Sequence, residues 1–138
     1  MIREALSNDL SLINNFLDCF NRKHINSIGD NPYNKFVFYY QDNKCIGFMQ
    51  YSYIIDRIEL DYIYVYQEYR NMGIASKLME YLINIAYKEN VINISLEVAS
   101  KNITAIKLYE KYGFKKSGVR CNYYKDDNGI LYIKEVRR

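Results

Sequence analysis

Residues 91–114 read VINISLEVASKNITAIKLYEKYGF, and the spacing of the apolar residues changes within this stretch. In its first eight residues apolar and polar side chains alternate, which is typical of a half-buried β-strand. After the polar residues SKN the apolar residues recur at helical spacing, and Gly113 is suited to end that helix. The stretch therefore predicts a strand, a polar loop and a helix, in that order.

The same order of elements occurs just upstream. RIELDYIYVY (57–66) has the composition of a strand, and from Ile74 the pattern becomes helical, with one apolar stripe made by Ile74, Leu78, Leu82, Ile85 and Ala86. Strand–helix–strand units join parallel strands, so we expect a parallel pair in the middle of a sheet.

Hairpins flank this central part. FVFYY (36–40) and CIGFMQYSYII (45–55) are separated by QDNK, and the tail pairs SGVRCNYY (117–124) with ILYIKEV (130–136) across KDDNG. Near the start we expect a short strand in IREAL, a helix over 7–23 capped by Ser7, and a loop with one helical turn over 24–35. The predicted fold class is α/β, with a mixed, mostly antiparallel central sheet that contains a parallel central pair and is flanked by helices.

Composition limits the possible functions. A chain of 138 residues with 49% hydrophobic and 25% charged residues has the size and composition of a single globular domain, 1–138. A net charge of +3 without basic clusters disfavours a nucleic-acid binder. Three scattered cysteines and a single histidine, His24, provide no zinc-type ligand set, so we expect no metal and idle thiols. Without a signal-peptide pattern or a long apolar run, we expect a cytoplasmic protein that does not enter a membrane.

The loop RNMGIAS, residues 70–76, follows a strand and opens a helix. The first amides of a helix lack internal acceptors and carry partial positive charge, a combination that binds phosphate. Gly73 and the small Ala75 would let the backbone approach such an anion. Gly73 is equally explained as an ordinary turn residue, and the loop is neither a dinucleotide-binding fingerprint nor a P-loop.

Two motifs in order resemble the GNAT superfamily of N-acetyltransferases. The pattern N-x-x-A-x-x-L-Y-x-x-x-G-F begins at Asn102, and [RQ]-x-x-G-x-[GA] begins about thirty residues earlier at Arg70. The resemblance covers residues 45–138 well and the first 44 in outline. It implies acetyl-CoA as the acetyl donor, with its pyrophosphate held by the loop and its pantetheine arm by strand backbone and Asn102. The cofactor-binding residues expected on this basis are Ile63, Tyr64, Val65, Arg70, Asn71, Met72, Gly73, Ile74, Ala75, Ser76 and Asn102.

The resemblance also implies two catalytic residues. Glu97 would be the general base that takes the proton of the acceptor amine, directly or through water, and Tyr109 the general acid that protonates the departing sulfur. From the residues alone, Glu97 could be a carboxylate on a solvated strand face, Tyr109 a core aromatic and Asn102 a helix cap.

Within the superfamily the sequence is most similar to ribosomal-protein-alanine N-acetyltransferases, through L-E-V before the helix and the later N-Y-Y at 122–124. It departs from them at Ser76, where a basic residue is usual, and in the short segment 24–35, which lacks their F-P-W-type sequence. The expected acceptor is thus a protein N-terminal amine, such as that of a ribosomal protein. A small-molecule amine and a catalytically silent CoA-binding module remain the alternatives.

Overall fold

The computed structural model describes residues 1–137. The strands are hydrogen-bonded in the order β1-β2-β3-β4-β5-β7-β6, with β4 and β5 parallel and the pairs β1–β2, β2–β3, β5–β7 and β6–β7 antiparallel. This arrangement confirms the predicted mixed sheet with a parallel central pair. The strands are β1 (Ile2–Glu4), β2 (Asn34–Gln41), β3 (Lys44–Ile54), β4 (Arg57–Val65), β5 (Asn93–Ala99), β6 (Lys115–Tyr124) and β7 (Asp127–Glu135). The helices are η1 (Ser7–Asp9), α1 (Leu10–Cys19), η2 (Gln67–Tyr69), α2 (Ile74–Lys88) and α3 (Ile103–Lys111).

The chain forms two compact units. One consists of Met1–Ser52 with Tyr62–Leu78, and the other of Tyr53–Asp61 with Met79–Arg138. Because β3, β4 and α2 contribute residues to both units, the chain passes between them within regular elements rather than through a linker.

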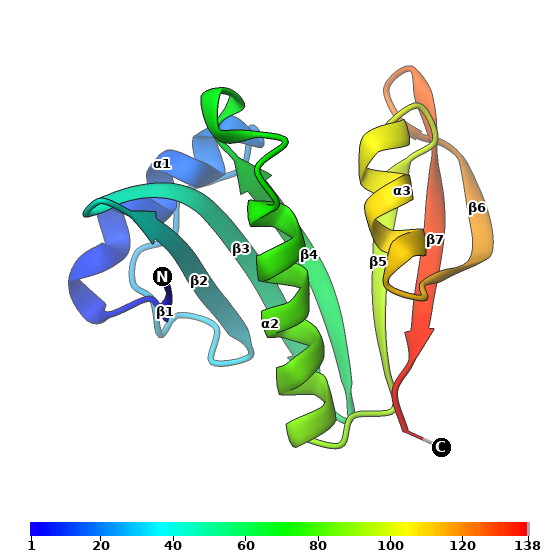
Figure 1. Cartoon of the computed structure of the whole chain (residues 1–138), viewed down its shortest axis with the longest axis horizontal. Coiled ribbons are helices and arrows are strands. Elements are labelled where there is room, and N and C mark those ends of the chain that lie inside the picture. The colour runs from blue at the N-terminus through cyan, green and yellow to red at the C-terminus, as the bar shows by residue number, and fades with distance from the viewer. Residues whose placement is uncertain (138) are drawn as a thin grey trace. The chain divides into compact units, whose positions relative to one another are not determined.

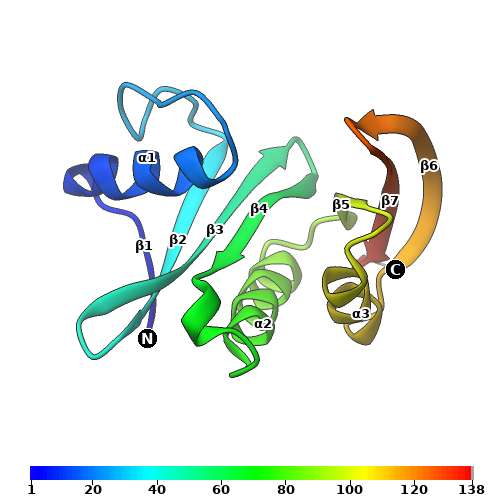
Figure 2. The same ribbon diagram turned by 90° about the horizontal axis from the view of Figure 1, so that it is seen from above.

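In the first unit, β2 and β3 form the expected hairpin, and β1 lies along the other edge of β2 (Figure 2). The two residues between β2 and β3, Asp42 and Asn43, have φ values of 51° and 64°. Two successive positive φ values match a tight hairpin turn of type I′, which aspartate and asparagine tolerate better than other non-glycine residues.

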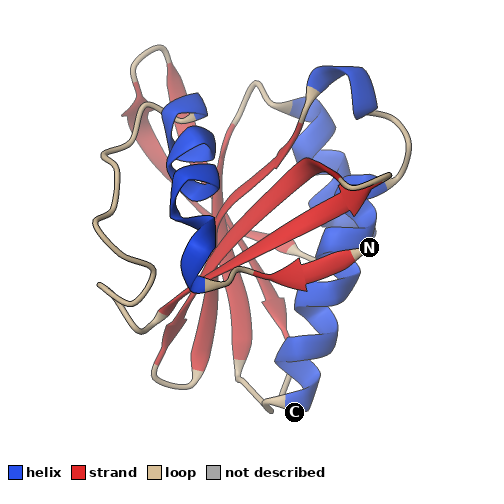
Figure 3. Cartoon of the chain, turned by 90° about the vertical axis from the view of Figure 1, so that its left-hand side faces the viewer, coloured by secondary structure: helices blue, strands red, loops and turns tan. Residues whose placement is uncertain are grey.

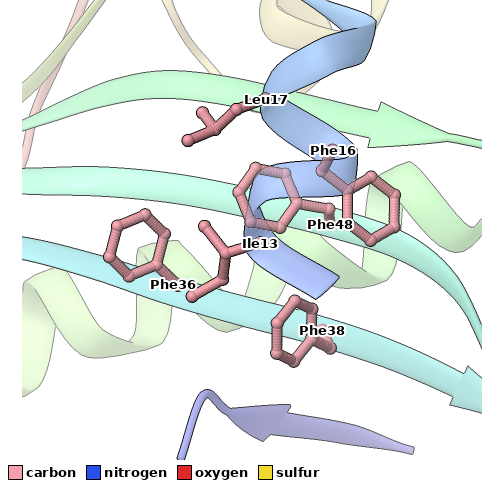
Figure 4. Close-up of a cluster of buried hydrophobic side chains, with 6 residues drawn as sticks. All are labelled: Ile13, Phe16, Leu17, Phe36, Phe38 and Phe48. Atoms are coloured by element: carbon pink, nitrogen blue, oxygen red, sulfur yellow. The ribbon is translucent and has the colours of Figure 1, made fainter. Parts of the chain in front are cut away.

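Helix α1 lies across the β2–β3 hairpin and supplies half of a hydrophobic cluster (Figures 3 and 4). The Phe16 and Phe48 rings stack with centroids 4.8 Å apart, which joins the helix to the middle of the sheet. The buried members of the cluster are Ile13, Phe16, Leu17, Phe36, Phe38 and Phe48.

In the second unit, β5 is flanked by β4 and β7, and α3 runs alongside β5 and β7 (Figure 1). The alternation predicted for this strand is confirmed, because Ile94, Leu96 and Val98 are buried. Leu96 is opposite Tyr132, whose hydroxyl donates to Glu110 of α3 at 3.3 Å. Helix α3 therefore covers the face of β5 that carries Leu96, and Glu97 projects from the opposite face.

Three local predictions need correction. Ser7 does not cap a helix by its side chain, since it is the first residue of η1, which has Leu6 in its N-cap position, and α1 begins only at Leu10. The Leu6 amide donates to Asp9 at 2.7 Å. Segment 24–33 contains turns but no helical turn. In the closing hairpin the turn is confined to residues 125–126, so that Gly129 belongs to β7 rather than to a loop.

Candidate functional site

The loop 70–76 lies in the first unit at the N-terminal end of α2 (Figure 1). Gly73 has a φ of +80°, which only glycine adopts without strain, and a Cβ built there would meet nothing within 4 Å. Glycine is thus required by the backbone conformation, while the space beside it is open. Asn71 also has a positive φ, of 65°. Residues 71–73 are exposed, so the backbone of this turn faces solvent.

Helix α2 starts immediately after this turn. Its first internal hydrogen bond runs from the Lys77 amide to the Gly73 carbonyl, at 3.1 Å. The amides of Ile74 and Ala75 precede that bond and have no acceptor within the helix. The buried Ile74 side chain fixes this end of the helix to the unit's core. An anion beside Gly73 would meet backbone donors and the positive end of a helix of fifteen residues.

Arg70 is engaged within the chain. Its Nε donates to the Val65 carbonyl at 2.8 Å, and its guanidinium lies 5.4 Å from the centre of the Tyr64 ring. Arg70 therefore fastens the loop to the end of β4. The same contact occupies one of the backbone groups that the sequence assigns to the pantetheine arm, the carbonyl of Val65. Ile63 and Tyr64 are half-buried. They lie in β4 beyond Ile58–Leu60, the residues of β4 that pair with β5.

Glu97 lies in the second unit, in the middle of β5 and opposite Leu131 of β7. Its side chain is only 19% exposed, which is inconsistent with a carboxylate on an open, solvated face. The oxygen Oε2 is buried and has no hydrogen-bond partner among residues 1–137. Leaving a buried polar atom unpaired costs about 1–3 kcal/mol, and groups that bear this cost are common at functional sites.

Residues of the closing hairpin surround this carboxylate. The Nη2 atom of Arg120 lies 3.6 Å from Glu97 Oε1, and the Arg120 guanidinium lies 4.6 Å from the centre of the Tyr123 ring. Oε2 occupies the space in front of Gly129, where a Cβ would overlap it. Neither Arg120 nor Gly129 stands out in the sequence, because their proximity to Glu97 depends on the register of three strands.

Tyr109 is buried in α3, with 6% of the residue exposed, and its ring is 5.9 Å from that of Phe114. Burial, and to a smaller extent the neighbouring Tyr124, raises the pKa of Tyr109 to about 12. The hydroxyl is therefore protonated at neutral pH, as a general acid must be.

Asn102 caps helix α3, since its side-chain oxygen accepts a hydrogen bond from the Ala105 amide at 3.2 Å. This confirms the structural interpretation of Asn102. The residue is exposed, and any contact of its amide group with a ligand would be additional to capping.

A polar network fixes the loop between β5 and α3. Asp127, at the start of β7, accepts hydrogen bonds from the Ser100 hydroxyl and from the Lys101 amide, the latter at 2.8 Å. The Ser100 bond is the main cause of a lowered Asp127 pKa. This network links the closing hairpin to the segment that joins Glu97 to Tyr109.

The model of the Acetyltransferase (GNAT) family matches residues 2–114. The chain belongs to this family. The [ribosomal protein bS18]-alanine N-acetyltransferase of Escherichia coli (strain K12) is 35% identical over 89 residues, which are 64% of this chain and 60% of that enzyme. The match thus spans less than two thirds of the relative's length.

Solved structures of GNAT proteins have the same fold. The ribosomal-protein-S18-alanine N-acetyltransferase from Escherichia coli matches with a TM-score of 0.84 and 25% identity, covering 100% of this chain and 94% of that one. Ard1 from Thermoplasma volcanium matches with a TM-score of 0.82 and 26% identity, covering 100% and 98%. A GNAT acetyltransferase from Elizabethkingia anophelis with acetyl-CoA bound shares the fold at 19% identity, with a TM-score of 0.74 and coverage of 98% and 97%.

Two further properties concern residues 1–137. No group of three or more His, Cys, Asp or Glu side chains is arranged to hold a metal ion within this part of the chain. None of the helices described there is long and apolar enough to cross a membrane.

Proposed function

We propose that residues 1–138 form one acetyltransferase domain, which uses acetyl-CoA to transfer an acetyl group to a primary amine. The preferred acceptor is the α-amine of a protein N-terminus, as in the ribosomal-protein-alanine enzymes to which the chain is similar. The observation that carries the proposal is the Glu97 carboxylate, which is largely buried and has an oxygen without a partner among residues 1–137.

The chemistry needs a group that removes a proton from the amine. A free α-amine has a pKa of about 8, well below the value of about 10.4 for a lysine side chain, so a carboxylate acting directly or through water suffices. Glu97 takes this proton as the amine nitrogen bonds to the thioester carbonyl carbon. The lower pKa of the α-amine is one reason to favour an N-terminus over lysine as the acceptor.

The second proton transfer occurs at sulfur. When the carbon–sulfur bond breaks, Tyr109 donates its phenolic proton to the departing thiolate. Solvent later returns a proton to the tyrosine and takes the one that Glu97 received. The raised pKa of Tyr109 keeps this proton in place throughout the physiological range. The thioester supplies the acetyl group, and the two side chains complete the proton balance by direct transfer in a ternary complex.

The loop 70–76 would hold the pyrophosphate of acetyl-CoA. The open backbone at Gly73, its positive φ and the start of α2 support this assignment. Backbone groups of Ile63–Val65 and the side chain of Asn102 would hold the pantetheine arm, and the Val65 carbonyl, which already accepts one hydrogen bond from Arg70, would use its second lone pair. The remaining loop residues assigned to the pyrophosphate are Asn71, Met72, Ile74, Ala75 and Ser76.

A panel of acceptors tests the proposal. Formation of free CoA from acetyl-CoA is followed chromatographically with alanine-first peptides, N-terminally blocked peptides, spermidine and free amino acids. Chromatography is preferable to a thiol reagent, because Cys19 and Cys121 are exposed free thiols that would react with it.

We expect turnover with the alanine-first peptides and none with their blocked counterparts. Faster turnover with a small amine would support the alternative substrate class. Thermal stabilisation by acetyl-CoA without any turnover would indicate a silent CoA-binding module. Absence of stabilisation at saturating acetyl-CoA would contradict the assignment of the loop itself.

A further inference from the structure

The Glu97 carboxylate rests against the closing hairpin. Its oxygen Oε2 is shut off from solvent, and a Cβ at Gly129 would overlap this oxygen and lie 3.0 Å from Tyr123 Cδ2. The carboxylate can therefore adopt this position only because residue 129 has no side chain. The φ of Gly129 is not positive, so the glycine is needed here for steric space rather than for its backbone conformation.

The other oxygen, Oε1, faces Arg120. The distance of 3.6 Å to Nη2 is too long for a hydrogen bond but within the range of an ion pair. The Arg120 side chain is 67% exposed, and its stacking on the Tyr123 ring restricts its position. Oε1 thus lies beside a positively charged group but accepts no hydrogen bond from it, so its lone pairs can accept a proton.

An irregularity in β6 brings these residues together. Arg120 is opposite Gly129, and Tyr124 is opposite Asp127, so three residues of β6 face a single residue of β7. Within this bulge Asn122 has a φ of 55°, and its amide donates to the Asn128 side chain at 2.9 Å. The bulge turns Tyr123 toward Gly129 and Arg120.

We propose that Arg120 and Gly129 are positioning residues for Glu97, which the hairpin holds with Oε2 packed over Gly129 and Oε1 presented to the acceptor amine. This inference rests on the proposed function, in which Glu97 is the base. In the proposed arrangement Oε1 takes the proton of the amine. The positive charge of the Arg120 guanidinium disfavours binding of a protonated amine next to Oε1.

The Gly129→Ala variant tests the steric part, and Gly118→Ala in the neighbouring strand is the matched control. A Cβ at Gly118 would meet nothing within 4 Å. The group that the new methyl at position 129 displaces is chiefly the end of a flexible side chain, so the variant is expected to fold. We expect kcat to fall by about tenfold or more, as for a misplaced catalytic group, with the KM for acetyl-CoA unchanged. Gly118→Ala should retain wild-type kinetics.

The charge is tested at Arg120. Arg120→Met keeps the length and apolar stem of the side chain but removes the charge, and Arg120→Lys keeps the charge. Exposed ion pairs contribute little, so we expect Met to lower kcat/KM by about three- to fivefold and Lys to restore most of that loss.

Repeating these changes in the Glu97→Gln background separates positioning from a general structural effect. If Gly129 and Arg120 act only through Glu97, then Gly129→Ala and Arg120→Met should cause no further loss of kcat in a protein that already carries Glu97→Gln. The positioning proposal is wrong if Glu97→Gln lowers kcat but Gly129→Ala behaves like Gly118→Ala. It is also wrong if Gly129→Ala and Arg120→Met both lower kcat further in the Glu97→Gln background. If Glu97→Gln leaves kcat unchanged, the assignment of the base fails first and the positioning proposal with it.

Discussion

The loop 70–76 and the surroundings of Glu97 are the two regions to which we assign a function, and they are built in different ways. The loop consists of consecutive residues, and the binding groups proposed there are backbone amides next to Gly73 and the start of α2. The Glu97 region consists of side chains from β5, β6 and β7 that are far apart in the sequence. The loop depends on one backbone conformation, whereas the Glu97 region depends on strand register.

This difference determines how each region should respond to substitution. Most side chains of the loop can vary as long as the turn and the helix start are preserved, so a change at Gly73 should have the largest effect there. Around Glu97 the reverse is expected, because the proposed chemistry there depends on individual side chains. The predictions below test this contrast, beginning with the largest expected effect.

Replacement of Glu97 by glutamine should have the largest effect. The side chain keeps its size but loses the ability to take a proton, so we expect kcat to fall by about 10²–10⁴-fold. Steady-state kinetics with an alanine-first peptide measure this, and the acetyl-CoA concentration that stabilises the protein against heat should stay the same. A rate within twofold of wild type would exclude Glu97 as the base.

Replacement of Tyr109 by phenylalanine should have the next largest effect. Loss of the phenolic proton should lower kcat by about ten- to a hundredfold, while the buried ring still packs against Phe114. Since the protonated form is the active one and the pKa is about 12, the wild-type rate should show no loss attributable to Tyr109 below about pH 11. A kcat of Tyr109→Phe equal to that of wild type would make Tyr109 a core aromatic only.

Gly73→Ala should weaken acetyl-CoA binding. A non-glycine residue at φ +80° costs about 1–2 kcal/mol, so either the turn changes or the strain remains, and the KM for acetyl-CoA should rise about 5- to 30-fold. Gly29→Ala is the control, because Gly29 has neither a positive φ nor any atom within 4 Å of a built Cβ. Equal KM values for the two variants would argue against a cradle at Gly73.

The same contrast explains which parts could be predicted from the sequence. The order of strands and helices follows from apolar periodicity, and Gly73, Gly113 and Asn102 mark turns and caps through local backbone requirements. Arg120 and Gly129 could not be found in this way, because the register of β7 against β5 brings Gly129 near Glu97 and the irregular register of β6 against β7 places Arg120 opposite Gly129. The cap predicted at Ser7 is wrong because Ser7 is already the first residue of η1, and the N-cap position falls on Leu6, whose amide donates to Asp9.

The smallest effect is expected at Asp127, which holds the loop after β5. Its lowered pKa means that the ionised carboxylate stabilises the fold at neutral pH, and that this contribution is lost as the pH falls through the folded-state pKa. Asp127→Asn should therefore lower Tm slightly at pH 7, and the difference from wild type should shrink below about pH 4. Asp126→Asn is the control, because Asp126 contacts Lys101 only through its backbone carbonyl. A Tm difference independent of pH would contradict this account.

The most direct test of the central claim uses one peptide with a free N-terminal alanine and a single internal lysine. The peptide is incubated with acetyl-CoA and either the wild-type protein or Glu97→Gln, and mass spectrometry of fragments locates the acetyl group. We predict acetylation of the alanine α-amine by the wild-type protein and almost none by the variant. Acetylation of the lysine instead, or no acetylation of either amine, would contradict the proposed function.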